Sequence, residues 1–152
     1  MMNMNVINEM KLELLSRSAN EGFARVAVAA FVAQLDPTIE ELSDIKTAVS
    51  EAVTNCIVHA YAERLGRVYI TARITDGGKV VIKIRDAGCG IADIGRAMEP
   101  LYTTAGGERA GLGFAVMQSF MDGVRVRSKP GAGTSVTMSK QLSLRVNGKQ
   151  NG

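Results

Sequence analysis

The chain has 152 residues, of which 46% are hydrophobic and 22% are charged, and its formal net charge is +3. This length suits one domain with a sizeable core, and the composition excludes a disordered protein. Two distant cysteines and one histidine are too few for a zinc site. We expect a single domain over residues 1–152, with an ordered core at about 10–142 and frayed ends.

The sequence contains no apolar run of the roughly 20 residues that a membrane span needs. Its first ten residues, MMNMNVINEM, do not combine a basic segment with an apolar one, as a signal peptide does. We therefore expect a cytoplasmic protein that does not contact a membrane.

The first predicted elements are a strand over residues 10–16 and a helix from Ser18 to about Leu35. Ser18 and Glu21 have the spacing of a capping box, and Asp36-Pro37 ends the helix. Helical spacing indicates one buried stripe, made of Phe23, Val26, Ala27, Ala30 and Phe31.

A second capping box, Thr38 to Glu41, opens a longer helix that we expect to reach about residue 62. Glu51 and Asn55 lie four residues apart, so they project side by side on this helix. Its expected buried stripe consists of Ile39, Leu42, Ile45, Val49, Ala52 and Cys56.

The second half of the chain changes from helical to strand periodicity. Apolar residues alternate over 68–74 and 80–84, on either side of a turn at Asp76-Gly77-Gly78-Lys79. A glycine-rich stretch follows over 86–113, in which 92–98 has room for one or two helical turns. A helix over 113–121 and two strands around 124–126 and 136–138 complete the chain. We expect an α+β two-layer sandwich: a mixed, mainly antiparallel sheet with helices on one face.

Four short motifs carry possible chemistry. On the long helix, the amide of Asn55 suits a hard cation and the carboxylate of Glu51 suits a proton. After a strand, Asp86 precedes Gly88 and Gly90, where an acid can bind an amino group while the backbone approaches a flat ring. Each motif alone is also compatible with an ordinary solvated helix face or a glycine turn.

The other two motifs are Gly111-x-Gly113, which opens a helix, and Gly133-Thr134. Free amides at a helix start suit phosphate groups. A flexible helix entry and a common small-residue turn are the alternative interpretations. Neither motif matches a P-loop or a dinucleotide fingerprint.

Together, the order E-x-x-x-N, D-x-G-x-G, G-x-G and G-T resembles the N box, the glycine boxes and the terminal threonine of the GHKL ATPase family. The segment LDPTIEELSDIKTAVSEAVTNCIVHAY is similar to anti-sigma-factor kinases, and above all to the anti-sigma-F factors of sporulating bacteria. The resemblance covers nearly the whole chain and implies the GHKL (Bergerat) ATP-binding fold.

The resemblance implies a role for each matching residue. Asn55 would coordinate Mg²⁺ and Glu51 would be the general base. Asp86 would bind the adenine amino group of ATP or ADP in a pocket shaped by Gly88 and Gly90. The remaining nucleotide contacts would come from Gly111 and Gly113 at the phosphates, Thr134 near the adenine, and Thr104 and Arg109 in a lid over residues 99–110, with Arg109 at the γ-phosphate.

Arg25 is a candidate partner-binding residue. It lies on the first helix, where Val28, Ala29 and Val32 are expected to add apolar surface beyond the core stripe, an arrangement that suits a protein partner. An intrahelical pair with Glu21 is the alternative.

The outward strand positions bear several basic residues. Strand alternation predicts such a solvated face, and a dimer interface over part of this face is the alternative. We therefore expect no direct nucleic-acid partner. These outward basic residues are Arg67, Arg73, Lys83, Arg85, Arg125 and Arg127.

The resemblance implies a protein serine kinase that inhibits a sporulation sigma factor and phosphorylates its anti-anti-sigma antagonist with Mg-ATP, as a homodimer. A general-stress sigma factor is an alternative target. A module that only sequesters its partner under nucleotide control is the rival class. A fragment of the MutL or Hsp90 type needs further domains, and a histidine kinase needs a preceding phospho-accepting helix.

Overall fold

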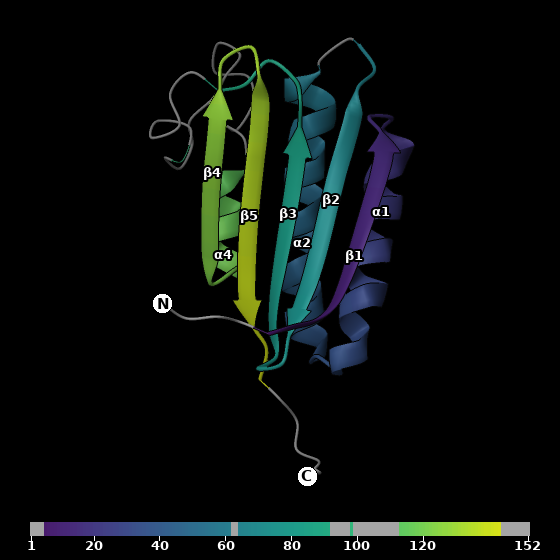
Figure 1. Ribbon diagram of the computed structural model, residues 1–152, viewed down its shortest axis with the longest axis vertical. Coiled ribbons are helices and arrows are strands. Elements are labelled where there is room, and N and C mark those ends of the chain that lie inside the picture. Colours follow the sequence, from purple (N-terminus) through teal and green to yellow (C-terminus); the bar gives the residue numbers. More distant parts are fainter. Residues whose placement is uncertain (1–4, 62–63, 92–97, 99–112, 144–152) are drawn as a thin grey trace.

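The computed structural model describes residues 5–61, 64–91, 98 and 113–143. Within these residues, three α-helices cover one face of a five-stranded sheet and none covers the other (Figure 1). The expected two-layer α+β sandwich is therefore confirmed. In chain order the elements are β1 (Val6–Leu15), α1 (Ala19–Val32), a 3-10 turn (Ala33–Leu35), α2 (Ile39–Thr54), a π-helical turn (Asn55–Ala60), β2 (Arg67–Thr75), β3 (Lys79–Asp86), α4 (Phe114–Phe120), β4 (Gly123–Lys129) and β5 (Gly133–Gln141).

The sheet has the strand order β1-β2-β3-β5-β4. All four pairs of neighbouring strands are antiparallel, so the parallel component of the expected mixed sheet is not found among the described strands. Two tight hairpins, β2–β3 and β4–β5, account for two of these four pairs, because a short turn can only join antiparallel neighbours. The β3–β5 pairing places Asp86 opposite Thr134, which brings two of the motifs together.

The core lies between the sheet and the helices. The inward strand positions are almost fully buried, as the alternation predicts. They pack against one face of α2 and against Phe114 and Met117 of α4. The inward strand residues are Val68, Ile70, Ala72, Val80, Ile82, Ile84, Val136 and Met138.

Helix α1 buries a different face from the one its spacing suggested. Phe23 and Val26 are 53% and 58% exposed, and Ala30 is also exposed. The buried residues are Ala24, Val28, Ala29 and Val32. Both sets have helical spacing, because this helix is apolar on two sides. Small and β-branched side chains let α1 approach its neighbours closely, and the larger Phe23 is left on the surface.

The two predicted capping boxes have different outcomes. At α2, the Thr38 hydroxyl accepts from the Glu41 N–H at 3.0 Å, and the Glu41 carboxylate accepts from the Thr38 N–H at 2.9 Å, which confirms the box. At α1, the Ser18 side chain makes no capping bond, and the Glu21 carboxylate pairs with Arg25 instead. The Ser18 box was therefore wrong.

Two boundaries and one buried position also differ from the sequence prediction. Strand β1 begins at Val6, where it pairs with Thr75 across an irregularity that interrupts the alternation. Ile39, expected in the buried stripe of α2, is 90% exposed because it lies in the first turn, beyond the sheet. The long helix changes to a π-helical turn at Asn55. The predicted helical turns at 92–98 lie, apart from Met98, outside the described residues.

Residues 142 and 143, the last that the structure describes, pack against the rest of the domain. Leu142 is buried, and Ser143 donates from its N–H and its hydroxyl to the Glu41 carboxylate at 2.8 and 2.7 Å. Burial opposes the ionisation of Glu41, but these bonds and those from Thr38 outweigh it and hold its pKa below the ordinary value. In the part of the chain that the structure describes, no helix is long and apolar enough to cross a membrane.

Candidate functional site

Glu51 lies in the last turn of α2, where its side chain is half-buried. Burial raises the pKa of its carboxyl above the ordinary value, and the charge of Glu21 on α1 raises it further. A carboxylate that binds a proton more readily than usual is better suited to act as a general base near neutral pH.

Asn55 follows one turn later and is also half-buried. Its backbone N–H donates to the carbonyls of Ala52 and Glu51, because Asn55 stands where α2 passes into the π-helical turn. Such turns inside α-helices are frequent at functional sites. The turn was not predicted, since hydrophobic spacing alone does not distinguish it from a continuous α-helix.

Gly113 brings the start of α4 against Glu51. It is the residue before the helix and has a left-handed backbone with φ of 72°. A methyl group at this position would lie 2.2 Å from Glu51 Oε1, so no other residue fits without displacing the carboxylate. Two motifs that are about 60 residues apart in the chain therefore meet at one point.

Asp86 ends β3 and is only 5% exposed. Its Oδ1 atom accepts hydrogen bonds from the N–H of Gly88 at 2.9 Å and the N–H of Thr134 at 3.2 Å. Burial raises the pKa of this carboxyl, and the hydrogen bonds oppose that effect. The side chain is thus held in place by two hydrogen bonds to one of its oxygens.

Cys56 lies near the Asp86 carboxylate, in the π-helical turn that follows α2. Its thiol is buried and donates to the Ala52 carbonyl at 3.5 Å, and burial followed by the nearby carboxylate charge raises the pKa of the thiol. The core position predicted for Cys56 is confirmed. Its proximity to Asp86 was not predicted, although its place directly after Asn55 was a possible signal.

Gly88 and Gly90 allow the loop after β3 to pack closely on both sides. A methyl group at Gly88 would lie 2.4 Å from the Ala60 carbonyl oxygen, and Cys89 donates its N–H to that oxygen at 3.0 Å. Gly90 has a φ of 78°, and a methyl group there would lie 2.2 Å from the Lys129 carbonyl oxygen. The loop is fixed between the end of the long helix and the β4–β5 turn.

Thr134 lies beside Asp86 at the start of β5. Its hydroxyl is 2.7 Å from the Ser128 hydroxyl, which also accepts from the Ile91 N–H at 2.7 Å. Ser128, which the sequence analysis missed, thereby ties the glycine loop to Thr134. Only the pairing of β4 with β5 identifies it, because Ser128 stands directly opposite Thr134.

The structure thus brings together Glu51, Asn55 and Gly113 at the C-terminal end of α2, and places Cys56, the residue after Asn55, near the group of Asp86, Gly88, Gly90 and Thr134. The predicted nucleotide contacts of Thr104, Arg109 and Gly111, and the lid that contains two of them, lie outside the described residues.

Arg25 lies between α1 and α2. Its guanidinium donates to the Glu21 carboxylate at 2.9 Å and to the Ser50 hydroxyl at 3.3 Å, so the intrahelical pair considered as an alternative is present. Ser50 precedes Glu51, and Arg25 is therefore close to the candidate site as well as partly exposed at the surface.

Residues 15–140 match the family described as the histidine kinase-like ATPase domain. The chain is 59% identical over 136 residues to a protein named anti-sigma F factor from Caldanaerobacter subterraneus subsp. tengcongensis, covering 89% of this chain and 94% of that protein. A protein of the same name from Clostridium botulinum (strain Eklund 17B / Type B) is 56% identical, with 90% and 96% covered.

Solved structures show the same fold at low sequence identity. One contains the RsbU and RsbW domains of Rv1364c from Mycobacterium tuberculosis, with a TM-score of 0.68, 20% identity, and coverage of 90% of this chain and 32% of that one. Another is the mycobacterial sensor histidine kinase MprB, with a TM-score of 0.56, 15% identity, and coverage of 90% and 99%.

Proposed function

The chain belongs to the histidine kinase-like ATPase domain family and, within it, to the family of the anti-sigma F factors, and on this premise we propose that it is an anti-sigma factor with protein serine kinase activity. It would bind a sporulation sigma factor and use Mg-ATP to phosphorylate the anti-anti-sigma antagonist of that complex. The convergence of four separated motifs on one region carries the proposal.

Adenine recognition would rest on Asp86. One of its oxygens is occupied by two backbone N–H groups, and the carboxylate is buried, so a hydrogen bond to the adenine amino group would form in surroundings that strengthen it. Close packing at Gly88 and Gly90 supports a narrow slot for a flat ring. Thr134 would present its hydroxyl on the same side.

Phosphate binding would rest on the start of α4 and on Asn55. Gly113 has no side chain to cover the first amides of that helix, and Glu51 stands directly beside it. An amide oxygen next to a carboxylate is a donor pair that suits Mg²⁺. We propose Asn55 as the magnesium ligand. The bound Mg-ATP would supply the γ-phosphoryl group and neutralise its charge.

Glu51 would then accept the proton of the substrate serine as that hydroxyl attacks. Its raised pKa favours this role, because the base holds the proton more firmly than an exposed carboxylate does. The half-buried position would keep water from competing with the serine. Thr104, Arg109 and Gly111 remain predicted contacts to the nucleotide.

The partner surface would be the outer side of α1. Phe23 and Val26 are exposed apolar side chains on this helix, and the partly exposed Arg25 is anchored nearby by Glu21 and Ser50. Apolar contacts around a held arginine are typical of energetically important interface positions. We propose that the sigma factor or the antagonist, or both in turn, bind here.

The setting of this activity is also a proposal. Sigma factors act on RNA polymerase, so we place the protein in the cytoplasm. We also propose a homodimer of single-domain chains, which light scattering at several protein concentrations would test. A general-stress sigma factor is the alternative target; binding assays with both kinds of sigma factor distinguish the two.

Transfer of label from γ-labelled ATP to the purified antagonist tests the kinase proposal against a module that only sequesters its partner. We expect label on a serine with the wild type, none with Glu51→Gln, and normal transfer with Glu40→Gln, an exposed glutamate in the first turn of the same helix. Sigma binding without any transfer by the wild type would establish the sequestering module instead.

A further inference from the structure

The open face of the sheet concentrates positive charge. By strand register, nine basic residues of the described strands lie on it, but only two acidic residues of these strands, Glu9 and Glu13. These residues together carry a net charge of +7, and since the whole chain carries +3, the remainder carries −4. The nine basic residues are Lys11, Arg67, Arg73, Lys79, Lys83, Arg85, Arg125, Arg127 and Lys129.

The two halves of this face differ. On β1 and β2, ion pairs Glu13–Arg67, at 3.0 Å, and Glu9–Arg73 neutralise much of the charge. On β3, β5 and β4, no carboxylate of the described residues lies within ion-pair distance of a second group of five basic side chains. We call this group the basic patch; it consists of Lys83, Arg85, Arg125, Arg127 and Lys129.

The patch is ordered by strand register into rows that cross the sheet. Arg85, Ser135 and Arg127 stand in one row, and Lys83, Thr137 and Arg125 in the next. Within a strand, residues two apart are separated by about 6.6 Å. A hydroxyl therefore lies between two cations in each row, a pattern that offers both charge and hydrogen bonds to successive phosphates.

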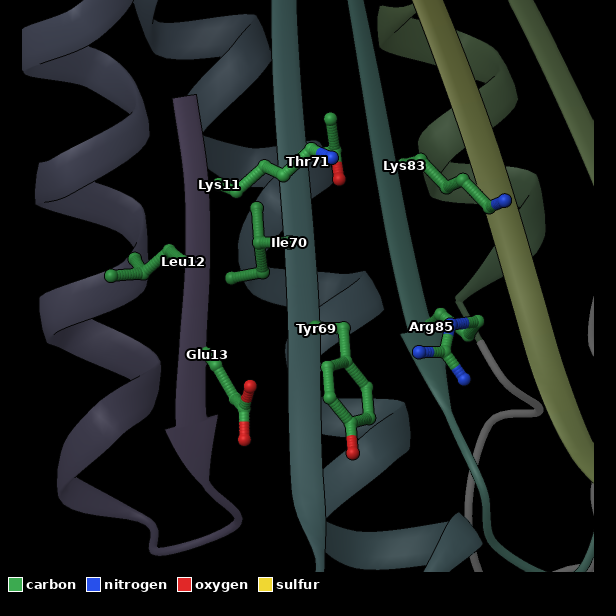
Figure 2. A pocket seen from close by; sticks show the side chains of 8 residues that line it. All are labelled: Lys11, Leu12, Glu13, Tyr69, Ile70, Thr71, Lys83 and Arg85. Atoms are coloured by element: carbon green, nitrogen blue, oxygen red, sulfur yellow. The ribbon is translucent and has the colours of Figure 1, made fainter. Parts of the chain in front are cut away.

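Two hollows lie on this face and share Arg85. One, of about 370 Å³, contains Lys83 and Tyr69 and is shown in Figure 2. The Arg85 guanidinium lies 4.1 Å from the centre of the Tyr69 ring. The other, of about 300 Å³, is at the end of the face, where Asp86 and Thr134 of the candidate site line it together with Arg85, Arg127 and Lys129. The basic patch is therefore bordered by one aromatic ring.

We propose that the basic patch binds single-stranded nucleic acid through its phosphates. A folded protein partner fits less well, because protein interfaces depend on apolar and aromatic anchors at their centre, and the patch has none. A lipid surface fits less well because no apolar side chain on β4 faces outward beside the patch to enter it. A second copy of the same patch would be repelled.

This proposal revises the expectation that the face is merely solvated. The sequence shows that basic residues alternate along the strands. The structure adds that β4 lies beyond β5, so that its arginines join those of β3 on one surface away from the acids of β1. It does not rest on the proposed kinase activity, because it concerns basic side chains of the open sheet face, although one hollow on this face reaches Asp86 and Thr134 of the candidate site.

Fluorescence anisotropy with a labelled 12-nucleotide oligothymidylate tests the proposal. Each neutralised phosphate of a single strand changes the slope of log K against log salt by about −0.7, so five contacts give about −3.5. From 50 to 200 mM salt we therefore expect the affinity to fall about a hundredfold. Arg125→Glu with Arg127→Glu should weaken binding at least tenfold and reduce the slope to about −2.

The matched control is Arg17→Glu with Lys46→Glu, which changes the net charge equally but lies outside the face. We expect it to change binding less than twofold. Equal losses in both double variants would overturn the proposal, as would an affinity that does not depend on salt. Tighter binding of a polyglutamate peptide or of duplex DNA would overturn the assigned ligand. Should the glutamate variant fail to fold by circular dichroism, Arg125→Gln with Arg127→Gln makes the same test.

Discussion

Replacing Gly113 with alanine tests the contact between the start of α4 and Glu51. The new methyl group would lie 2.2 Å from Glu51 Oε1 and 3.1 Å from its Cδ, and φ at this residue is 72°. Two separate effects follow. Alanine in a left-handed conformation costs about 1–2 kcal/mol, and the carboxylate must move by about 1 Å to restore an ordinary contact distance.

The two effects have different consequences. For a domain of this size, the backbone strain should lower the melting temperature by about 2–8 °C. The displaced carboxylate should lower phosphotransfer more severely, because a misplacement of about 1 Å costs on the order of 100-fold in rate. The affinity for ADP should change less, since Asp86 lies elsewhere in the site.

A double-variant cycle separates the two effects. In a Glu51→Ala background the methyl group of Gly113→Ala meets no carboxylate, so only the backbone strain should remain. We would measure thermal unfolding by circular dichroism in all four proteins, and phosphotransfer for the wild type and Gly113→Ala. If Gly113→Ala matched the wild type in both melting temperature and rate, the contact would not constrain Glu51, and the reasoning would fail.

Three further predictions test individual residues. Glu51→Gln should raise the free energy of unfolding at pH 8 but not at pH 4. Burial and the charge of Glu21 raise the pKa of Glu51 in the folded state, so the contribution of Glu51 to stability is lost as pH rises through that pKa. Denaturant titrations at both pH values check this, and an equal effect at both would contradict it. Asp86→Asn should raise the Kd for ADP about 10- to 100-fold. The Kd for GDP should rise less, because an amide can donate to the guanine oxygen. Calorimetry measures both Kd values, and equal losses of affinity would exclude recognition of the base by Asp86. Thr38→Ala should cost about 1 kcal/mol of stability without changing ADP affinity, since the cap lies at the far end of α2 from Glu51; a weaker ADP affinity would show that the cap acts on the site.

The decrease of the kinase rate at acidic pH should depend on the same carboxylate, Glu51. A base must be deprotonated to accept a proton, so phosphotransfer should fall as pH drops through the raised pKa of Glu51, above the range of an ordinary glutamate.

The sequence correctly predicted the features that depend on interactions between residues close together in the chain. Strict alternation located β2, β3, β4 and β5, since a half-buried strand repeats every two residues. The Thr38 capping box marked the start of α2, because its two hydrogen bonds join residues only three apart. Asp86 and Gly113 were recognised as site candidates for the same reason. An acid at a strand end and a glycine at a helix start can be identified from the few residues around them.

Choices between equivalent local patterns required the tertiary structure. Helix α1 has apolar residues on two sides, so its spacing permits either Phe23 or Val28 in the core; packing against α2 decided for Val28. Ser18 had the correct spacing for a capping box, but the Glu21 carboxylate forms an ion pair with Arg25, four residues later, instead. These outcomes depend on neighbours that sequence spacing does not identify.

By itself, then, the sequence determined the elements and the chemistry available at each motif, because both depend on interactions over a few residues. Only the tertiary structure decided that Gly113 touches Glu51, that Thr134 holds Asp86, and that the arginines of β3 and β4 share one face. Contacts between distant segments arise from strand order and helix packing, which are set by burial over the whole chain rather than by any one segment.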